Sequence, residues 1–176
     1  MNKCKISGLL LAAFIGLMGF NQQAFAGTAK TGFIPPAWSQ KLRASERFQL
    51  VLDNAAVLDK ETGLVWEKSP DTTKRNWTTA ISYAYNKTVG GRDGWRLPTV
   101  EELKSLVDKT QSSPVLPSGH PFTNVQSDHY WSVTTIASDL SSAWAVSFGD
   151  GFVDYGNKIT GVYVWCVRGG HGHDGQ

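Results

Sequence analysis

The stretch Gly94-Trp95-Arg96-Leu97-Pro98-Thr99 says the most about the fold of this 176-residue chain. Thr99 followed by Glu102 is the residue pairing of a capping box, in which each side chain bonds the other residue's backbone N–H. Pro98 disfavours a helical conformation in the residue before it and so prevents an earlier start. The sequence therefore predicts a helix that opens at Thr99 and runs through Leu103 and Leu106.

The residues just before this helix are expected to be structural. Trp95 and Leu97 are large apolar side chains that can fill the core. Arg96 can form a two-pronged ion pair with a carboxylate, and Glu102 or Asp108 would be in reach. We therefore interpret the stretch as a structural element and not as a ligand site.

A second helix is predicted upstream of the stretch. Apolar residues recur there at helical spacing behind a possible N-cap, Asn76, and the pattern ends near Lys87, before a glycine-rich turn. The spaced residues are Trp77, Ala80, Ile81 and Ala84.

Strand patterns flank the two helices on both sides. The candidates are Phe48 to Leu52, Ala56 to Leu58, Leu64 to Trp66, Tyr130 to Thr134, Trp144 to Phe148, Gly151 to Tyr155 and Tyr163 to Val167. Asp59 to Gly63 and Gly149 to Gly151 are turn sequences, which predicts antiparallel hairpins. In Trp144 to Phe148 large residues alternate with small or polar ones, so Trp144 is expected to face the core, as are Trp131 and Trp165. The fold class predicted from these patterns is α+β.

Composition indicates one globular domain. The chain is 41% hydrophobic and 18% charged, with 17 basic and 15 acidic residues. Lys3 and Lys5 belong to a segment that we expect to be removed, so the mature chain is almost neutral. A neutral chain lacks the general positive surface that nucleic-acid binding requires, and no nucleic-acid partner is predicted.

The N-terminus has the pattern of a secretory signal peptide. Two lysines precede the apolar run Ile6 to Phe20, and Ala24-Phe25-Ala26 supplies the small residues of a cleavage site after Ala26. The predicted organisation is a signal peptide over 1–26, an extended leader over 27–46, a folded domain over 47–168 and a disordered tail over 169–176. The protein is thus expected in the periplasm, at the cell surface or outside the cell, without stable membrane insertion after cleavage.

The stretch at 94–99, together with Glu102 and Leu103, resembles the W-R-L-P-T-x-x-E-L signature of a bacterial exported family named after the C-terminal domain of the Legionella collagen-like adhesin. Further segments agree in order: 62–66, the helix opening at Trp77, 130–132, Trp144 with Phe148 and Gly151, and 164–168. The resemblance covers about 53–168. It implies a C-type-lectin-like or formylglycine-generating-enzyme-like fold, with two helices and a mixed, mostly antiparallel sheet.

The resemblance also implies a role for Cys166. Many relatives carry a cysteine where this chain has Ala84, and by analogy with lectin-like domains that cysteine would bridge to the one in the last strand. Cys166 is therefore expected to be a small buried residue that faces Ala84, although pairing with another chain stays open.

Two groups of residues are candidates for ligand binding. Lys68, Lys74 and Arg75 place three positive charges around one loop, where an anionic polysaccharide could bind, although a solvated loop explains them equally well. Asp150 and Asp154, with Asn157, supply oxygen atoms near a hairpin, which would suit calcium or be ordinary turn chemistry. No metal or cofactor is assigned, because the two internal histidines, His120 and His129, lack organised partner ligands.

The sequence favours a non-enzymatic function. It contains no G-x-S-x-G elbow, no glycine-rich phosphate loop and no thiol pair, so no catalytic residue can be named. The prediction is an exported binding module that contacts a surface or matrix polysaccharide, or a protein partner, through the loops 68–76 and 111–128. A structural subunit of an envelope assembly, with the leader docked on a partner, is the alternative, and an enzyme of unknown chemistry is a weaker third.

Overall fold

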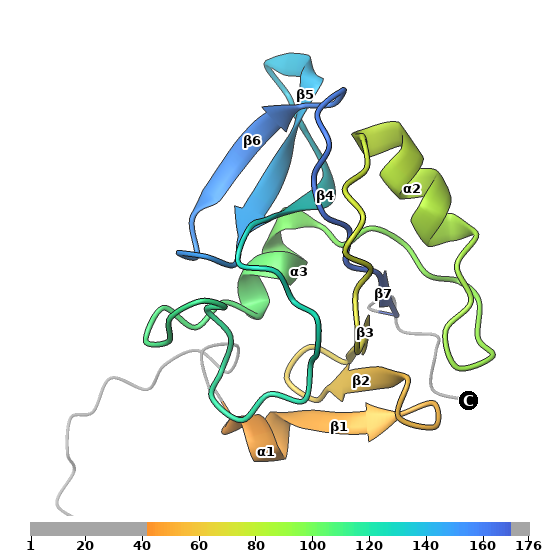
Figure 1. Ribbon diagram of the computed structural model, residues 1–176, viewed down its shortest axis with the longest axis vertical. Helices are drawn as coiled ribbons and strands as arrows, with labels where there is room; N and C mark the ends of the chain where they lie inside the picture. Colours follow the sequence, from red (N-terminus) through yellow and green to blue (C-terminus); the bar gives the residue numbers. More distant parts are fainter. Residues whose placement is uncertain (1–41, 170–176) are drawn as a thin grey trace, which may run out of the picture. The chain divides into compact units, whose positions relative to one another are not determined.

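The computed structural model describes residues 42–169, and Figure 1 shows their arrangement. Its elements in chain order are α1 (Ala44–Arg47), β1 (Phe48–Val51), β2 (Ala56–Asp59), β3 (Leu64–Glu67), α2 (Trp77–Tyr85), α3 (Val100–Ser105), β4 (His129–Ile136), β5 (Asp139–Ser147), β6 (Val153–Asn157) and β7 (Val167–Arg168). The predicted signal peptide and its cleavage site, residues 27–41 of the leader and residues 170–176 of the tail lie outside the described residues.

The strands form two antiparallel sheets, one in the order β1-β2-β3-β7 and one in the order β4-β5-β6. Figure 1 shows β1, β2 and β3 of the first sheet in orange to yellow with β7 in dark blue, and the second sheet in teal (β4) and lighter blue (β5, β6). The α+β class is thus confirmed, but the single mixed sheet is not what the described residues form. The parallel contact among them is an isolated bridge between Tyr130 and Tyr163. The C-type-lectin-like arrangement stays a prediction.

Both predicted helix starts are confirmed in detail. The Asn76 side chain accepts a hydrogen bond of 2.9 Å from the backbone N–H of Thr79 and so caps α2. At α3 the Thr99 hydroxyl accepts from the Glu102 N–H, and the Glu102 carboxylate accepts from the Thr99 N–H, which is the capping box. These caps satisfy N–H groups that a helix cannot satisfy itself.

The stretch 94–98 before α3 forms hydrogen bonds with three parts of the fold, namely α3, β7 and β4. Arg96 donates two hydrogen bonds to the Glu102 carboxylate, at 2.8 and 2.7 Å, and its backbone N–H bonds the carbonyl of Val167. The carbonyl of Pro98 accepts from Val133 in β4. Trp95 is buried, as expected. The structural interpretation of this stretch is therefore confirmed.

The C-terminal segment 162–168 lies between two hydrophobic clusters. Tyr163, Trp165 and Val167 pack against the larger cluster, which contains Trp66, Phe122, Tyr130 and Phe148. The intervening residues belong to a second cluster under α2, with Ala84, Trp95 and Trp131. Extended backbone points alternate side chains in opposite directions, so one segment serves both clusters. Only Val167–Arg168 is a regular strand in it, shorter than the predicted strand over 163–167.

Two segments expected to be irregular also contribute to the core. The last residues of the predicted leader, 44–46, are helical in α1, and Ala44 is buried. The loop 111–128 places Val115, Leu116 and Phe122 in the larger cluster. Packing thus begins three residues before the predicted start of the domain, and part of the long loop covers the core.

Candidate functional site

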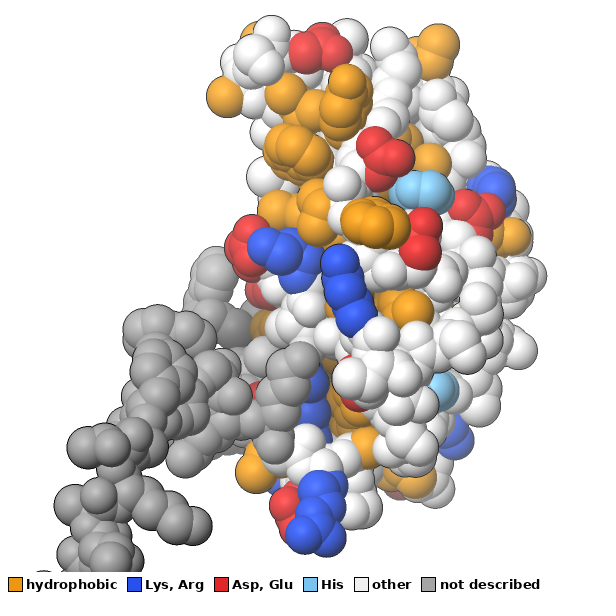
Figure 2. Space-filling view, turned by 90° about the vertical axis from the view of Figure 1, so that its left-hand side faces the viewer, with side chains coloured by type: hydrophobic (Ala, Val, Ile, Leu, Met, Phe, Trp, Pro, Cys, Tyr) orange, Lys and Arg blue, Asp and Glu red, His pale blue; other side chains and the backbone are white. Residues whose placement is uncertain are grey.

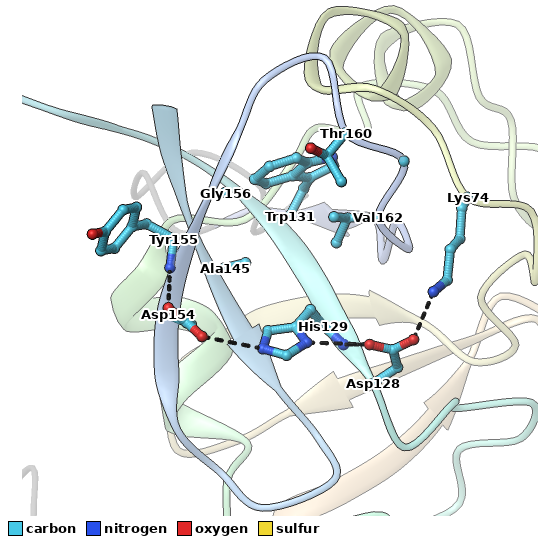
Figure 3. Close-up of a pocket in the computed structure, with 11 residues that line it drawn as sticks. Lys74, Asp128, His129, Trp131, Ala145, Asp154, Tyr155, Gly156, Thr160 and Val162 are labelled. Carbon is cyan, nitrogen blue, oxygen red and sulfur yellow. Dashed lines mark hydrogen bonds and ion pairs between the residues drawn. The ribbon is translucent and has the colours of Figure 1, made fainter. Parts of the chain in front are cut away.

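An open cleft of about 290 Å³ lies beside the edge strand β6. Figure 3 shows its side chains, which come from the loop before α2, the start of β4, the strands β5 and β6, and the segment after β6. The lining residues are Lys74, Asp128, His129, Trp131, Ala145, Asp154, Tyr155, Gly156, Thr160, Gly161 and Val162. A cleft of this size is at the lower end of the range for ligand-binding pockets.

A row of four charged or ionisable side chains borders the cleft. The Lys74 ammonium group donates a 2.7 Å hydrogen bond to Asp128, whose other carboxylate oxygen lies 3.1 Å from Nδ1 of His129. Nε2 of His129 lies 3.7 Å from the Asp154 carboxylate on the far side. Figure 3 shows these four side chains end to end along the cleft. The row presents hydrogen-bonding groups whose positions are set by one another.

Asp128 holds this row together as an anion. Partial burial of its carboxyl group opposes ionisation, but the hydrogen bonds from Lys74 and from the backbone N–H of His129 outweigh that effect and lower the pKa of Asp128 to about 2. The same hydrogen bond raises the pKa of Lys74. Both groups are therefore charged throughout the physiological pH range.

The floor of the cleft depends on a glycine. Trp131 is buried beneath it, and its indole N–H donates to the backbone carbonyl of Arg75 at 2.9 Å. A Cβ atom on Gly156 would stand 3.1 Å from the Trp131 ring. Gly156 thus leaves the space above the indole that a larger residue would occupy.

The structure brings together two of the five predicted binding residues. Lys74 and Asp154 line the same cleft, although they come from the loop before α2 and from β6. Arg75 instead pairs with Asp71 and lies over the Tyr83 ring at 3.7 Å from the ring centroid. Together with the Lys74–Asp128 pair, this means that two of the three predicted loop cations are neutralised by carboxylates.

Lys68 and Asp150, the other two predicted residues, do not line this cleft. Lys68 is half-buried, and its backbone pairs with Ala55 and Thr123. Asp150 lies in the turn before β6 and accepts a 3.1 Å hydrogen bond from the N–H of Phe152.

The oxygen atoms considered for calcium do not converge. Asp154 faces His129, whereas the Asn157 side chain accepts a hydrogen bond from the N–H of Ile159, two residues further on. Within residues 42–169, no three His, Cys, Asp or Glu side chains form a group that could hold a metal ion.

One expectation about the tryptophans is wrong. Trp131 and Trp165 are buried, but Trp144 is only half-buried and packs against exposed Tyr155. Trp144 has the same strand parity as Val146 and Phe148, but its partner across to the edge strand β6 is the exposed Tyr155. Alternation along a strand predicts the face of a side chain and not how far the core extends beneath it.

Cys166 is buried and unpaired in the described part of the chain. It belongs to the same hydrophobic cluster as Ala84, and burial, reinforced by the nearby Glu67 carboxyl group, raises the pKa of its thiol. The thiol is therefore protonated and unreactive at neutral pH. That Ala84 and Cys166 face each other closely enough for a disulfide stays a prediction.

Sequence reasoning missed most of the cleft. Asp128 and His129 are neighbours in the sequence. No local pattern connects them with Lys74, which lies 54 residues before Asp128, or with Asp154. The pairing of β4, β5 and β6 brings His129 and Asp154 together, and the bridge between Arg75 and Val162 brings the loop with Lys74 to the same cleft.

No helix among residues 42–169 is long and apolar enough to span a membrane. Comparison with curated proteins gives no match. The family model described as the Lcl C-terminal domain matches residues 55–168, which include α2, α3 and every strand of the two sheets except β1. With this match over most of its length, the chain belongs to the Lcl C-terminal domain family.

Proposed function

We propose that the protein is an exported, non-enzymatic binding module that holds a polysaccharide in the cleft beside β6. The observation that carries the proposal is the row Lys74, Asp128, His129 and Asp154 along an open cleft. Its carboxylates can accept hydrogen bonds from sugar hydroxyls, and the ammonium and imidazole groups can donate.

The mutual contacts of the row favour binding. Lys74 is held both by Asp128 and by the Tyr163 ring, which lies 4.8 Å from its nitrogen. Side chains already fixed in place lose little conformational freedom when a ligand binds. This argument for binding is independent of the prediction that the protein is exported, which rests on residues 1–26.

The charge balance argues against a purely anionic ligand. The cleft has one lysine and two aspartates, and Arg75 is paired with Asp71 outside it. A polyanion needs locally concentrated, unpaired positive charge. We therefore propose recognition through hydrogen bonds to hydroxyl groups, in place of the charge contact with Lys68, Lys74 and Arg75 that the sequence suggested.

Binding is also favoured over catalysis by the lining. Among the described residues that line the cleft there is neither serine nor cysteine, and the His129 ring pairs with the carboxylates of Asp128 and Asp154 and not with the hydroxyl group of Thr160. Nucleophilic catalysis needs a nucleophile within hydrogen-bond reach of its base.

The test is a glycan array followed by calorimetry with the polysaccharide that binds. Asp154→Asn removes a carboxylate charge at the cleft and should lower affinity about tenfold, as loss of a charged hydrogen bond does. Glu101→Gln is the matched control, because Glu101 is an exposed carboxylate on α3 outside the cleft. Absence of any bound polysaccharide, or equal affinity of the two variants, would falsify the proposal.

A protein partner is the second candidate, favoured by a different observation. Large hydrophobic side chains are exposed on and beside the sheet formed by β4, β5 and β6. They are Leu140, Phe152, Tyr155 and Ile159. Exposed apolar surface of this kind is often part of an interaction site. An envelope protein that co-purifies with the wild type and is lost on Ile159→Ser, with glycan binding absent in both, would favour this reading.

A further inference from the structure

A second hollow lies across β6 from the cleft. It has a volume of about 310 Å³ and is lined by Ile136, Ser138, Asp139, Trp144 and Tyr155. Figure 3 shows the Tyr155 side chain pointing away from the row at Asp154 and His129, on the other side of the β6 ribbon. Figure 2 looks at the face on which β6 lies and shows hydrophobic side chains gathered beside a histidine that is flanked by acidic residues.

Two aromatic rings form a corner in this hollow. Trp144 and Tyr155 are direct cross-strand partners in the β5–β6 pair, with ring centroids 5.9 Å apart and planes at 83°. Because strand register fixes which residues lie opposite each other, the corner is built into the sheet. Tyr155 is 61% exposed, so its ring is available to a ligand.

Besides the two rings and the apolar Ile136, the hollow is lined by Ser138 and by the negatively charged Asp139. One carboxylate oxygen of Asp139 accepts hydrogen bonds from the hydroxyl and the N–H of Ser141, and hydrogen bonding lowers the pKa of Asp139. Its second oxygen and the Ser138 hydroxyl add hydrogen-bonding capacity at the rim.

No lysine or arginine lines this hollow among the described residues. The cation nearby, Lys158, donates to the Leu140 carbonyl and the Thr135 hydroxyl and lies over the Trp77 ring. A sulfated or carboxylated sugar would meet the Asp139 carboxylate at the rim, whereas the charge of Lys158, which helps to lower the pKa of Asp139, lies outside the lining of the hollow. The Asp139 carboxylate therefore disfavours an anionic ligand and can accept hydrogen bonds from the hydroxyl groups of an uncharged sugar.

We propose that the Trp144–Tyr155 corner is a stacking subsite for a neutral hexopyranose unit of a polysaccharide. A pyranose ring has a face of C–H groups and a rim of hydroxyls. The C–H face packs on the negative face of an aromatic ring, and the hydroxyls reach the Asp139 carboxylate. This inference rests on the proposed polysaccharide binding and narrows its ligand class.

The experiment uses calorimetry of the purified protein with cellohexaose, mannohexaose and chitohexaose, and with dextran sulfate as the anionic probe. Wild type should bind one of the neutral hexasaccharides with little dependence on salt, because no charge contact is involved. Tyr155→Ala should weaken this binding about tenfold, since it removes the exposed ring on which the sugar packs.

Two variants keep the result interpretable. Tyr155→Phe retains the ring and should bind within about threefold of wild type, because stacking needs the ring and not the hydroxyl. Tyr85→Ala is the matched control, since Tyr85 on α2 is 78% exposed and is not part of the hollow. Because Tyr155 is exposed, its truncation should leave the fold intact, which the melting temperature checks.

The outcomes separate this inference from the proposal for the cleft. Tyr155 lines both the cleft and the hollow, whereas Asp154 lines only the cleft. Binding that is lost in Tyr155→Ala, kept in Tyr155→Phe and unchanged in Asp154→Asn therefore supports the aromatic subsite. Loss of binding in both Tyr155→Ala and Asp154→Asn places the ligand in the cleft and overturns the separate subsite. Binding that depends on Asp154 and is indifferent to Tyr155→Ala overturns the subsite and leaves the cleft standing. Failure of all three neutral probes, or binding of dextran sulfate alone, overturns the subsite as well.

Discussion

Two aromatic pairs of this molecule have similar contact geometry and different burial. Trp66 and Trp165 meet edge to face at 5.5 Å and 63°, and Trp144 and Tyr155 meet at 5.9 Å and 83°. The first pair is fully buried, whereas Tyr155 is exposed at the outer edge of the second sheet. Contact geometry alone therefore does not tell a core residue from a recognition residue. Burial does, because the large hydrophobic gain comes from apolar area removed from water.

The largest expected effect is on the buried pair. Trp165 touches Trp66, Phe122, Phe148 and Tyr130, so Trp165→Ala leaves a cavity that several elements line. The free energy of unfolding should fall by about 4 to 5 kcal/mol in urea titration. Tyr155→Ala should change it by less than about 0.5 kcal/mol. Equal losses in the two variants would abolish the distinction between the two pairs.

The second cluster can be tested with an added crosslink. Ala84→Cys should form a disulfide with Cys166, because both residues lie in one buried cluster. Closing a loop of about 80 residues stabilises the fold by roughly 4 kcal/mol in the chain-entropy model, if the geometry is unstrained. Thiol titration under oxidising conditions gives the answer. Two free thiols in the folded variant would show that α2 and the C-terminal segment do not face each other here.

Substitution in a buried ion pair should lower the free energy of unfolding more than substitution in an exposed one, as for the two aromatic pairs. Arg47 donates to both oxygens of Asp59, and both side chains are buried. Asp59→Asn removes the fully buried partner and leaves Arg47 only the Glu61 carboxylate, at 3.2 Å, so it should cost about 3 kcal/mol of unfolding free energy. The exposed pair Lys104–Glu101 provides the control, since Glu101→Gln should cost less than about 0.5 kcal/mol. Chemical denaturation of both variants tests the contrast.

A smaller effect is expected at the start of α3. Thr99→Ala removes the hydroxyl that accepts the Glu102 N–H, and loss of such a cap costs about 1 kcal/mol. Thr99→Ser keeps the acceptor and should restore most of that stability. If both variants melt together, the capping box contributes nothing beyond the packing of the helix.

The smallest effect concerns acid stability at the cleft. The folded-state pKa of Asp128 is lowered from its ordinary 3.8 to about 2, so its contribution is present above pH 3.8 and is lost as the pH falls through about 2. Asp128→Asn should therefore lower stability at neutral pH by less than about 1 kcal/mol, because the pair with Lys74 is partly exposed. The difference from wild type should shrink below pH 3.8 in thermal melts. A constant difference down to pH 2 would argue that the side chain acts through packing instead.

Local structure in this protein was readable because its signals lie within a few residues of each other. Asn76 caps α2 and Thr99 pairs with Glu102 at α3, as their spacing predicted. The hairpin between β2 and β3 follows from the turn sequence at 59–63. In each case the interacting atoms belong to residues close in the chain, so the pattern contains both partners.

Only part of the candidate site could be predicted, because its residues lie far apart in the sequence. Lys74 and Asp154 were named from their residue types, but Lys68, Arg75 and Asp150 were named with them and lie outside the cleft. A count of charges along a loop does not reveal that Arg75 already has a carboxylate partner in Asp71. Whether a charge is available for a ligand depends on its neighbours in space.

The sequence by itself determined the α+β class, the helix starts, the structural role of the stretch at 94–99 and the family to which the chain belongs. Tertiary structure alone decided that the strands divide into two sheets, that Trp144 lies at the edge of the core, and that Asp128 and His129 join Lys74 and Asp154 along one cleft. The physical reason is the separation along the chain of the residues that interact. Capping and periodicity act between near neighbours, whereas burial and ion pairing depend on which distant segments the strand pairing brings together.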